Sequence, residues 1–374
     1  MTQNFYADKL LGLKENFSVK IITGIRGVGK STLLKNFAES LKAAGEEIIF
    51  IDCAENPQLK NFRQLYEFVD AKTLELDKFF LLIDETDLID EWEKAINALF
   101  AGTSAEIYMT GSSDVLAENI SVLLPDNCDV LKMYPLSFAE YEKISPSAES
   151  LENYLHFGGM PAALDVDKNT LPKFLRGLSY EILFDIIEKN YLSDARLLRT
   201  ITKFLACNVG GAVSINEYFK SLDENNLRKV RNYLNIVLEA GLFKKLPRFD
   251  IKDETFMTGG EKFYCVDNGI LSAFAQVDEI ILMENAVCIE LLRRGFTISF
   301  GKFGAMNINF VAERGNKKIF IQVLPPDDSI TARRITRPLR ALPDDAEKIL
   351  ISLKPVKISD GIKNITLRDF LLNT

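Results

Sequence analysis

The residues with the clearest chemistry form a glycine-rich run that fits the pattern G-x-x-x-x-G-K-[ST] at residues 24–31. The run follows an apolar segment, 19–23, that predicts a strand, and it opens a segment, 31–43, that predicts a helix. Glycines let successive backbone N–H groups turn toward phosphate oxygens, and the helix start adds the positive end of its dipole. The pattern predicts a loop that binds nucleotide phosphates, formed by Gly24, Ile25, Arg26, Gly27, Val28, Gly29, Lys30, Ser31 and Thr32.

Two side chains of this run have specific chemical roles. The ammonium group of Lys30 would reach the β- and γ-phosphates of a nucleoside triphosphate, and the hydroxyl of Ser31 would bind Mg²⁺. The alternative interpretation is a glycine-rich turn that only joins a strand to a helix. The predicted strand before the motif and the predicted helix after it favour the nucleotide site.

A second run, at residues 79–85, is an apolar strand that ends in the two carboxylates Asp84 and Glu85. Asp84 would hold the magnesium ion, usually through water, and Glu85 would lie next to the γ-phosphate and polarise an attacking water. The alternative is a buried strand that ends in a solvated acidic turn. The phosphate-binding pattern upstream favours the catalytic interpretation.

The next apolar run, 105–110, ends in polar residues. Thr110 and Ser112 are candidates to contact the γ-phosphate or the attacking water, and a simple turn is the alternative. Lys30, Asp84 and Glu85 are therefore the predicted catalytic residues, with Ser31 and Asp84 as the predicted metal ligands.

The composition excludes several other chemistries. The chain of 374 residues has a single histidine, His156, so a histidine-rich zinc site is excluded. Its five cysteines are widely spaced, which suits reduced thiols better than disulfides. The formal net charge of −8 argues against a protein that coats nucleic acid. We expect a cytoplasmic protein, because no signal peptide or membrane-spanning run is visible.

The pattern of elements predicts an α/β fold with several parts. Short apolar runs alternate with helical segments, which indicates a parallel sheet covered by helices. The apolar runs lie at 19–23, 47–52, 79–84, 105–110 and 129–134, and the helical segments include 31–43 and 90–100. Residues 137–189 read as helical around Gly158–Pro161. Three helices are predicted next, at 197–207, 214–222 and 226–240. They precede a strand at 242–249, a loop with Gly259 and Gly260, and a strand at 262–266. That order is typical of a winged helix.

The last hundred residues return to an α/β pattern, with a helix at 280–294 and strands at 297–301, 307–313 and 318–323. The expected division is a P-loop core at 1–135, a helical lid at 136–192, a winged helix at 193–267 and a nuclease-like domain at 268–374.

The chain resembles the prokaryotic AAA-type ATPases that join a P-loop domain to an uncharacterised C-terminal domain of restriction-nuclease-like fold. The resemblance is carried by residues 24–34, Ile83-Asp84-Glu85, Trp92, residues 110–113, YPLSFAEY at 134–141, GGMPA at 158–162 and YCVD at 264–267. It implies ATP as the nucleotide and Mg²⁺ as its cofactor. The choice of adenine over guanine rests on the resemblance, because no residue motif in the chain itself selects between them.

The departures from this family concern catalysis. The family usually has Gln where this chain has Asp87, and a Gly-Arg pair where it has Asp126 and Asn127. Loss of an arginine that contacts phosphate can lower turnover by about 10³-fold or more. Arg26 is a candidate substitute, unless it pairs with a neighbouring acid. The resemblance therefore implies ATP binding with slow hydrolysis.

The partners remain open at this stage. In the helix at 226–240, an apolar face of Leu227, Val230, Leu234, Val237 and Leu238 leaves Arg228, Arg231 and Asn235 for a DNA groove or a protein surface. Metal-dependent cleavage by the C-terminal part is disfavoured, because Asn309 and Gln322 stand where acidic ligands are expected. We expect an ATPase that drives a conformational switch. The alternative is a nucleotide-gated DNA- or protein-binding module with negligible turnover.

Overall fold

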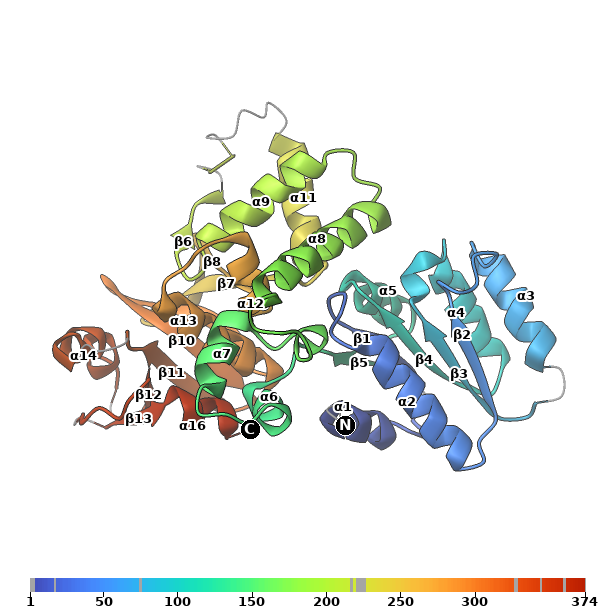
Figure 1. The fold of residues 1–374 in the computed structure, drawn as a ribbon, viewed down its shortest axis with the longest axis horizontal. Coiled ribbons are helices and arrows are strands. Elements are labelled where there is room, and N and C mark those ends of the chain that lie inside the picture. The colour runs from blue at the N-terminus through green and yellow to red at the C-terminus, as the bar shows by residue number, and fades with distance from the viewer. Residues whose placement is uncertain are drawn as a thin grey trace. The chain divides into compact units, whose positions relative to one another are not determined.

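The computed structural model describes residues 4–16, 18–73, 76–215, 218–219, 227–325, 329–343, 345–358 and 361–373. The chain divides into two units (Figure 1). The first comprises Met1–Tyr134 with the short segments Asp185–Leu192 and Glu239–Gly241, and the second comprises the remainder. Within the described ranges, every helix is too short or too polar to cross a lipid bilayer.

The first unit is built on a five-stranded parallel sheet in the order β2-β3-β4-β1-β5. Its strands have apolar residues on both faces, as expected for a parallel sheet with helices on each side. The strands are β1 (Val19–Thr23), β2 (Ile48–Asp52), β3 (Phe79–Asp84), β4 (Ala105–Gly111) and β5 (Cys128–Lys132). All five predicted strands of this core are confirmed, with ends that differ by at most two residues.

Helices cover both faces of this sheet (Figure 1). They are α1 (Asn4–Gly12), α2 (Lys30–Ala43), α3 (Phe62–Thr73), α4 (Trp92–Gly102) and α5 (Val115–Leu123), with a 3₁₀ turn η1 (Thr86–Leu88). Phe37 of α2 packs on Tyr108 of β4, with ring centroids 4.8 Å apart. On the opposite face, side chains of α3, α4 and α5 join the strands in one apolar cluster.

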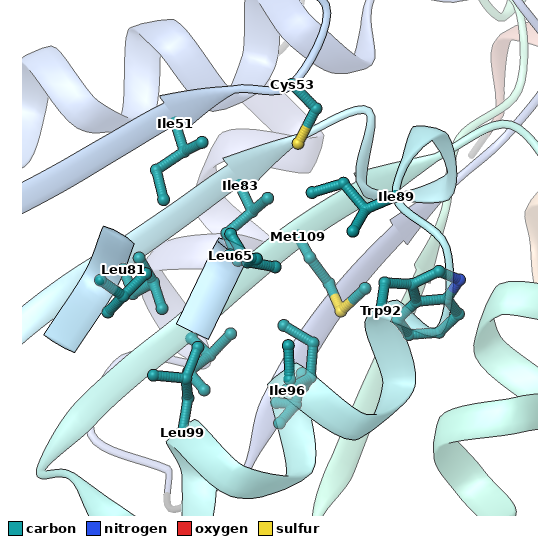
Figure 2. Packing of buried hydrophobic residues seen from close by; sticks show 14 of the residues in the cluster. Ile51, Cys53, Leu65, Leu81, Ile83, Ile89, Trp92, Ile96, Leu99 and Met109 are labelled. Atoms are coloured by element: carbon teal, nitrogen blue, oxygen red, sulfur yellow. The ribbon is translucent and has the colours of Figure 1, made fainter. Parts of the chain in front are cut away.

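That apolar cluster holds the strand ends in place (Figure 2). The residues labelled there come from neighbouring strands, from helices packed on them, and from the positions directly after β2 and η1: Ile51, Cys53, Leu65, Leu81, Ile83, Ile89, Trp92, Ile96, Leu99 and Met109. Ile83 is fully buried directly before Asp84 and Glu85. The cluster therefore positions the carboxyl end of β3, where the predicted acidic residues lie.

The second unit begins with helices and ends in a large mixed sheet. Its helices are α6 (Phe138–Ile144), α7 (Ser150–Phe157), η2 (Pro161–Ala163), α8 (Leu171–Lys189), α9 (Ala195–Cys207) and α11 (Leu227–Glu239). Helix α8 begins in this unit and its last residues belong to the first unit; the final residue of α11 likewise belongs to the first unit. Ser137 and Glu140 form a capping box that starts α6.

The sheet of the second unit has eight strands in the order β13-β12-β11-β10-β9-β7-β8-β6. The strands are β6 (Ala212–Val213), β7 (Phe243–Asp250), β8 (Thr255–Cys265), β9 (Thr297–Phe303), β10 (Met306–Arg314), β11 (Lys317–Val323), β12 (Glu347–Ser352) and β13 (Ile362–Thr366). The remaining helices are α12 (Asn268–Phe274), α13 (Glu279–Arg293), α14 (Ser329–Ile335), α15 (Arg337–Arg340) and α16 (Leu367–Leu372). The β7–β8 hairpin and the C-terminal strands thus share one sheet, and the four-part division of the chain stays a prediction.

Two expectations for the second unit were wrong. Gly259 and Gly260 lie within β8 and not in a loop, because the hairpin turns earlier, at residues 251–254. Leu227 is 44% exposed at the start of α11, so the predicted apolar face of that helix is not buried at its first residue. The predicted helix 214–222 falls mostly outside the described residues.

Three of the sequence runs that carry the family resemblance meet inside the second unit. Leu136 N–H donates to Gly159 O (2.8 Å), and Gly159 N–H donates to Asp267 Oδ2 (2.7 Å). Tyr154 Oη–H donates to Leu136 O (3.0 Å). Burial raises the pKa of Asp267 to about 6, although the backbone N–H groups that it accepts oppose this shift. These runs therefore build a structural junction around a buried carboxylate.

We expect Gly158→Ala to lower the free energy of unfolding by about 2–4 kcal/mol. The backbone of Gly158 has φ 72°, and an added Cβ would lie 2.2 Å from Asp267 Oδ1. Gly177→Ala in α8 is the matched control, because nothing lies within 4 Å of its Cβ position, and it should raise stability slightly. Urea denaturation of the full chain measures both, and equal midpoints for the two variants would refute this account of the junction.

Candidate nucleotide site

The predicted phosphate loop lies between β1 and α2. β1 ends at Thr23 and α2 begins at Lys30, as the motif requires. Gly27 (φ 85°) and Gly29 (φ 96°) adopt left-handed backbone conformations that favour glycine. A Cβ on Gly24 would lie 2.5 Å from Met133 O, so only glycine fits there. Of the other predicted loop residues, Ile25 and Val28 are buried, Ser31 is half-buried, and Arg26 and Thr32 are exposed.

Lys30 is folded back onto the loop. Its Nζ donates to Gly24 O (2.7 Å) and Ile25 O (3.0 Å), and the side chain is almost fully buried. Burial lowers the pKa of Lys30 to about 8, and the nearby carboxylate of Asp87 opposes that shift. The carbonyl oxygens are neutral partners, so the ammonium group is placed to exchange them for a charged ligand.

A threonine hydroxyl ties the two predicted acidic residues together. Thr110 Oγ1 donates to Asp84 Oδ1 (2.5 Å) and accepts from Glu85 N–H (2.9 Å). Both Thr110 and Asp84 are buried. The hydroxyl of Thr110 thus positions the carboxyl ends of β3 and β4 relative to each other, while its predicted contact with phosphate stays a prediction.

Glu85 has an uncommon backbone conformation. Its φ is 54°, in the left-handed region, and it directly precedes the 3₁₀ turn η1. The side chain is half-buried. Burial raises the pKa of Glu85, and the positive charge of Lys189 opposes the shift. A carboxylate with a raised pKa at a strand end is suited to accept a proton from water.

Ser112 lies in a charged network with residues that the sequence analysis did not select. Asp87 Oδ2 accepts from the backbone N–H and the hydroxyl of Ser112, both at 3.0 Å. Lys189 Nζ lies 3.0 Å from Asp87 Oδ2 and 3.4 Å from Asp185 Oδ1, and it also donates to Ser112 Oγ. All these residues belong to the first unit.

The charges of this network stabilise one another. Burial alone would raise the pKa of Asp87, but Lys189 and the Ser112 donors together hold it below its usual value. Burial likewise disfavours the charged form of Lys189, yet Asp87 and Asp185 raise its pKa. Asp87 Oδ1 is buried without a hydrogen-bond partner among the described residues. An unpartnered carboxylate oxygen of this kind indicates a place for a donor or a hydrated ion.

Sequence reasoning missed Lys189 and Asp185 as parts of the site. Asp87 was noticed only as a departure from the family pattern. The available signal was the spacing of Asp185 and Lys189, an acid–base pair at positions i and i+4 near the end of a helix. Such a pair is usually a solvated surface pair. Arg26 forms an ion pair with Asp185 (3.3 Å), as one of the two sequence-based interpretations predicted.

The first unit has the phosphate loop and the parallel sheet of a P-loop domain. Residues 16–142 match the family model of an AAA domain, and residues 148–280 match the model of a domain of unknown function. The chain is 28% identical, over an alignment of 394 residues, to an uncharacterized protein of Haemophilus influenzae; the alignment covers 98% of this chain and 97% of that protein.

AMPPCP-bound DnaA from Aquifex aeolicus aligns with a TM-score of 0.32 at 14% identity, over 64% of this chain and 89% of that chain. A RuvB mutant of Thermotoga maritima aligns with a TM-score of 0.34 at 16% identity, over 66% and 88%. The P-loop assignment rests on the phosphate loop, the strand order and the family match.

Proposed function

We propose that the chain binds Mg·ATP at the loop of residues 24–31 and hydrolyses it slowly. The observation that supports this most is the buried ammonium group of Lys30, which lies against neutral loop carbonyls with a pKa near 8. A triphosphate would replace these acceptors with charged oxygens, and backbone N–H groups of the loop would surround them. Equilibrium binding of Mg·ATP to the full chain, together with phosphate release, tests the proposal.

The donor groups near the loop fit a magnesium ion. Mg²⁺ prefers oxygen ligands and keeps several waters, and it is usually held by one or two carboxylates with substrate phosphates. The hydroxyl of Ser31 and the carboxylate of Asp84 are the proposed ligands, directly or through water. The ion would neutralise the phosphate charge that develops in the reaction. The unpartnered Asp87 Oδ1 is consistent with further hydration at this edge of the sheet.

The chain's own residues would perform the remaining chemistry. Glu85 would accept a proton from the attacking water, because its raised pKa lies closer to neutral pH than that of a free carboxylate. Thr110 would hold the carboxylate of Asp84 and the backbone of Glu85 in place through its two hydrogen bonds. Lys30 would hold the transferred phosphoryl group.

We propose that Lys189 supplies the positive charge near the γ-phosphate that an arginine supplies in the family that the chain resembles. Lys189 is half-buried in the site, carries a charge stabilised by Asp87, and lies on the last turn of α8. A bound γ-phosphate would compete with Asp87 for this ammonium group. Since α8 continues into the second unit, a change of partner at Lys189 would be transmitted along the helix as a conformational switch.

We expect Lys189→Met to lower turnover at saturating ATP by about 10-fold to 1,000-fold, with ATP affinity reduced less than in Lys30→Ala. Lys168→Met is the matched control, because Lys168 is an exposed lysine whose ion pair with Glu149 lies in the second unit. Steady-state phosphate release measures both variants. Turnover by Lys189→Met equal to that of the control would remove Lys189 from the mechanism.

A nucleotide-gated binding module with negligible turnover is the second candidate. It is favoured by Asp126 and Asn127, which stand where an arginine is expected from the family resemblance. Arg228, Arg231 and Asn235 are exposed on α11, opposite its buried apolar residues, and the hairpin β7–β8 follows. We propose a winged helix here, with DNA or a protein as its partner. Phosphate release with and without duplex DNA separates this candidate from an ATPase.

The C-terminal strands are proposed to form an inactive nuclease-like domain. Gln322 Oε1 accepts from Asn309 N–H (2.9 Å), and Asn309 Oδ1 accepts from Val323 N–H (3.1 Å). These neutral amides are thus engaged with backbone groups at the place where acidic ligands would stand. Glu290 is paired with two neighbouring arginines, Arg293 and Arg294. The arrangement favours a role in packing or recognition over cleavage.

A further inference from the structure

One nitrogen of an arginine side chain in the sheet of the second unit lacks a hydrogen-bond partner among the described residues. Arg248 lies in β7, between Met257 of β8 and Phe300 of β9. Its Nε atom is buried and has no acceptor among the described residues. Leaving a buried N–H of a charged group without an acceptor is unfavourable, and such groups in folded proteins usually have a partner. The arrangement indicates a site that is completed by an external acceptor.

Arg248 lines a pocket of about 280 Å³. The wall also contains Lys262, Phe300, Lys302 and Asn307, and no acidic side chain is part of the described lining. Lys302 Nζ donates to the neutral Asn307 Oδ1 at 3.3 Å. Three cationic side chains therefore face one small pocket.

The strand register explains why these side chains converge. The pairing of β7 with β8 shifts between the pairs Leu246–Lys262 and Arg248–Met257, so residues 258–261 bulge away from the ladder. Pro247, on the facing strand, has no N–H with which to continue the ladder. On the other side of β7, Arg248 is paired with Phe300, and Lys302 projects from the same face two residues later. The bulge leaves open space beside the guanidinium group.

One of the three cations is already neutralised. Glu284 Oε1 accepts from Lys262 Nζ (3.1 Å) and from Tyr264 Oη–H (2.5 Å), and all three residues are buried. This contact fixes Lys262 at the pocket wall. The charges of Arg248 and Lys302 remain for a ligand, and within the described residues neither forms an ion pair.

We propose that this pocket, which we call the β7–β9 anion pocket, binds a phosphoryl group. A guanidinium group presents a planar fork of donors that matches phosphate oxygens, and a lysine adds a mobile point charge. The pocket lies at the lower limit of the roughly 300–1,000 Å³ of small-molecule sites, so it has room for a phosphoryl group and part of the molecule that carries it. The phosphoryl group comes either from a nucleic-acid backbone or from a small phosphate compound.

The proposal is independent of nucleotide binding at the phosphate loop. It is tested in full-length Lys30→Ala protein, in which that loop is disabled, with three probes: inorganic phosphate, a labelled single-stranded oligonucleotide and its duplex. Arg248→Met and Lys302→Met are compared with Lys363→Met, a control that removes an exposed lysine of β13 outside the pocket. Without any probe, Arg248→Met should be at least as stable as its parent, because it removes an unsatisfied buried group.

We expect at least one probe to bind saturably, with its dissociation constant raised at least tenfold by Arg248→Met and by Lys302→Met and unchanged by Lys363→Met. Binding of phosphate alone assigns the pocket to a small compound, and tighter binding of an oligonucleotide assigns it to a nucleic-acid backbone. If no probe binds, or if Arg248→Met and Lys302→Met bind as the control does, the proposal is overturned. Should Arg248→Met fail to fold, Lys302→Met carries the same test.

Discussion

Replacing Lys30 by alanine is expected to weaken Mg·ATP binding about 100-fold to 1,000-fold. The ammonium group is buried at the centre of the phosphate loop, so its loss would leave triphosphate charge in a desolvated place without its partner. A tenfold change in affinity corresponds to about 1.4 kcal/mol, and removing one member of a buried charged pair typically costs about 2–5 kcal/mol. Isothermal titration calorimetry of the full chain measures the change.

Lys35→Ala is the matched control for this prediction. Lys35 lies on the same helix, α2, but it is exposed and paired with Asp52. Its loss should leave ATP affinity unchanged within about twofold, which is the size expected for an exposed ion pair. Equal ATP affinity of Lys30→Ala and Lys35→Ala would mean that the loop is not the nucleotide site.

The pKa of Lys30 predicts a second result, proton uptake, that the calorimetric titration with Mg·ATP can measure. With a pKa near 8 in the free protein, the side chain is about half-protonated at pH 8, and bound phosphate would raise that pKa. ATP binding should therefore take up about half a proton per site at pH 8 and weaken as the pH rises above 8. Titrations in two buffers of different ionisation enthalpy reveal this uptake, which should persist in Glu85→Gln.

Glu85→Gln is expected to reduce turnover by about 100-fold to 10,000-fold while ATP remains bound. The amide keeps the size of the side chain and the backbone bond from Glu85 N–H to Thr110 Oγ1, but it cannot accept the proton of the attacking water. Wild-type protein and variant are compared by steady-state phosphate release and by equilibrium binding of ATP.

Glu91→Gln is the control for Glu85→Gln. Glu91 is also a glutamate with a positive φ, 55°, directly before a helix, but it is exposed and paired with Lys94. The Glu91→Gln substitution should leave turnover unchanged. If Glu85→Gln turns over ATP as fast as this control, Glu85 does not activate water, and the second candidate function gains support.

The local patterns predicted the core of the first unit well. Buried parallel strands are long apolar runs, and the loop of residues 24–31 joins one such strand to a helix, so both are visible without knowledge of distant contacts. The predicted position of Asp84 and Glu85 at the end of β3 follows from the same signal. The order of the strands in the sheet depends on crossovers, which no local pattern predicts.

The parts that were missed depend on contacts between distant residues. Lys189 reaches Asp87 across 102 positions of the chain, and nothing near either residue indicates this pairing. Gly259 and Gly260 resemble turn residues, but the shifted pairing of β7 and β8 keeps them inside a strand. The runs GGMP and YCVD carry the family resemblance, and the structure explains them as packing around Asp267.

The most direct test of the central claim is a single-turnover experiment with the full chain in excess over γ-labelled ATP and Mg²⁺, in which bound and released label are followed over time. We predict that wild-type protein captures the ATP and converts it slowly to ADP and phosphate. In the same experiment Glu85→Gln should retain it as ATP and Lys30→Ala should leave it unbound. If wild-type protein leaves the ATP free in solution, or captures it equally well without Lys30, the account of this site is contradicted.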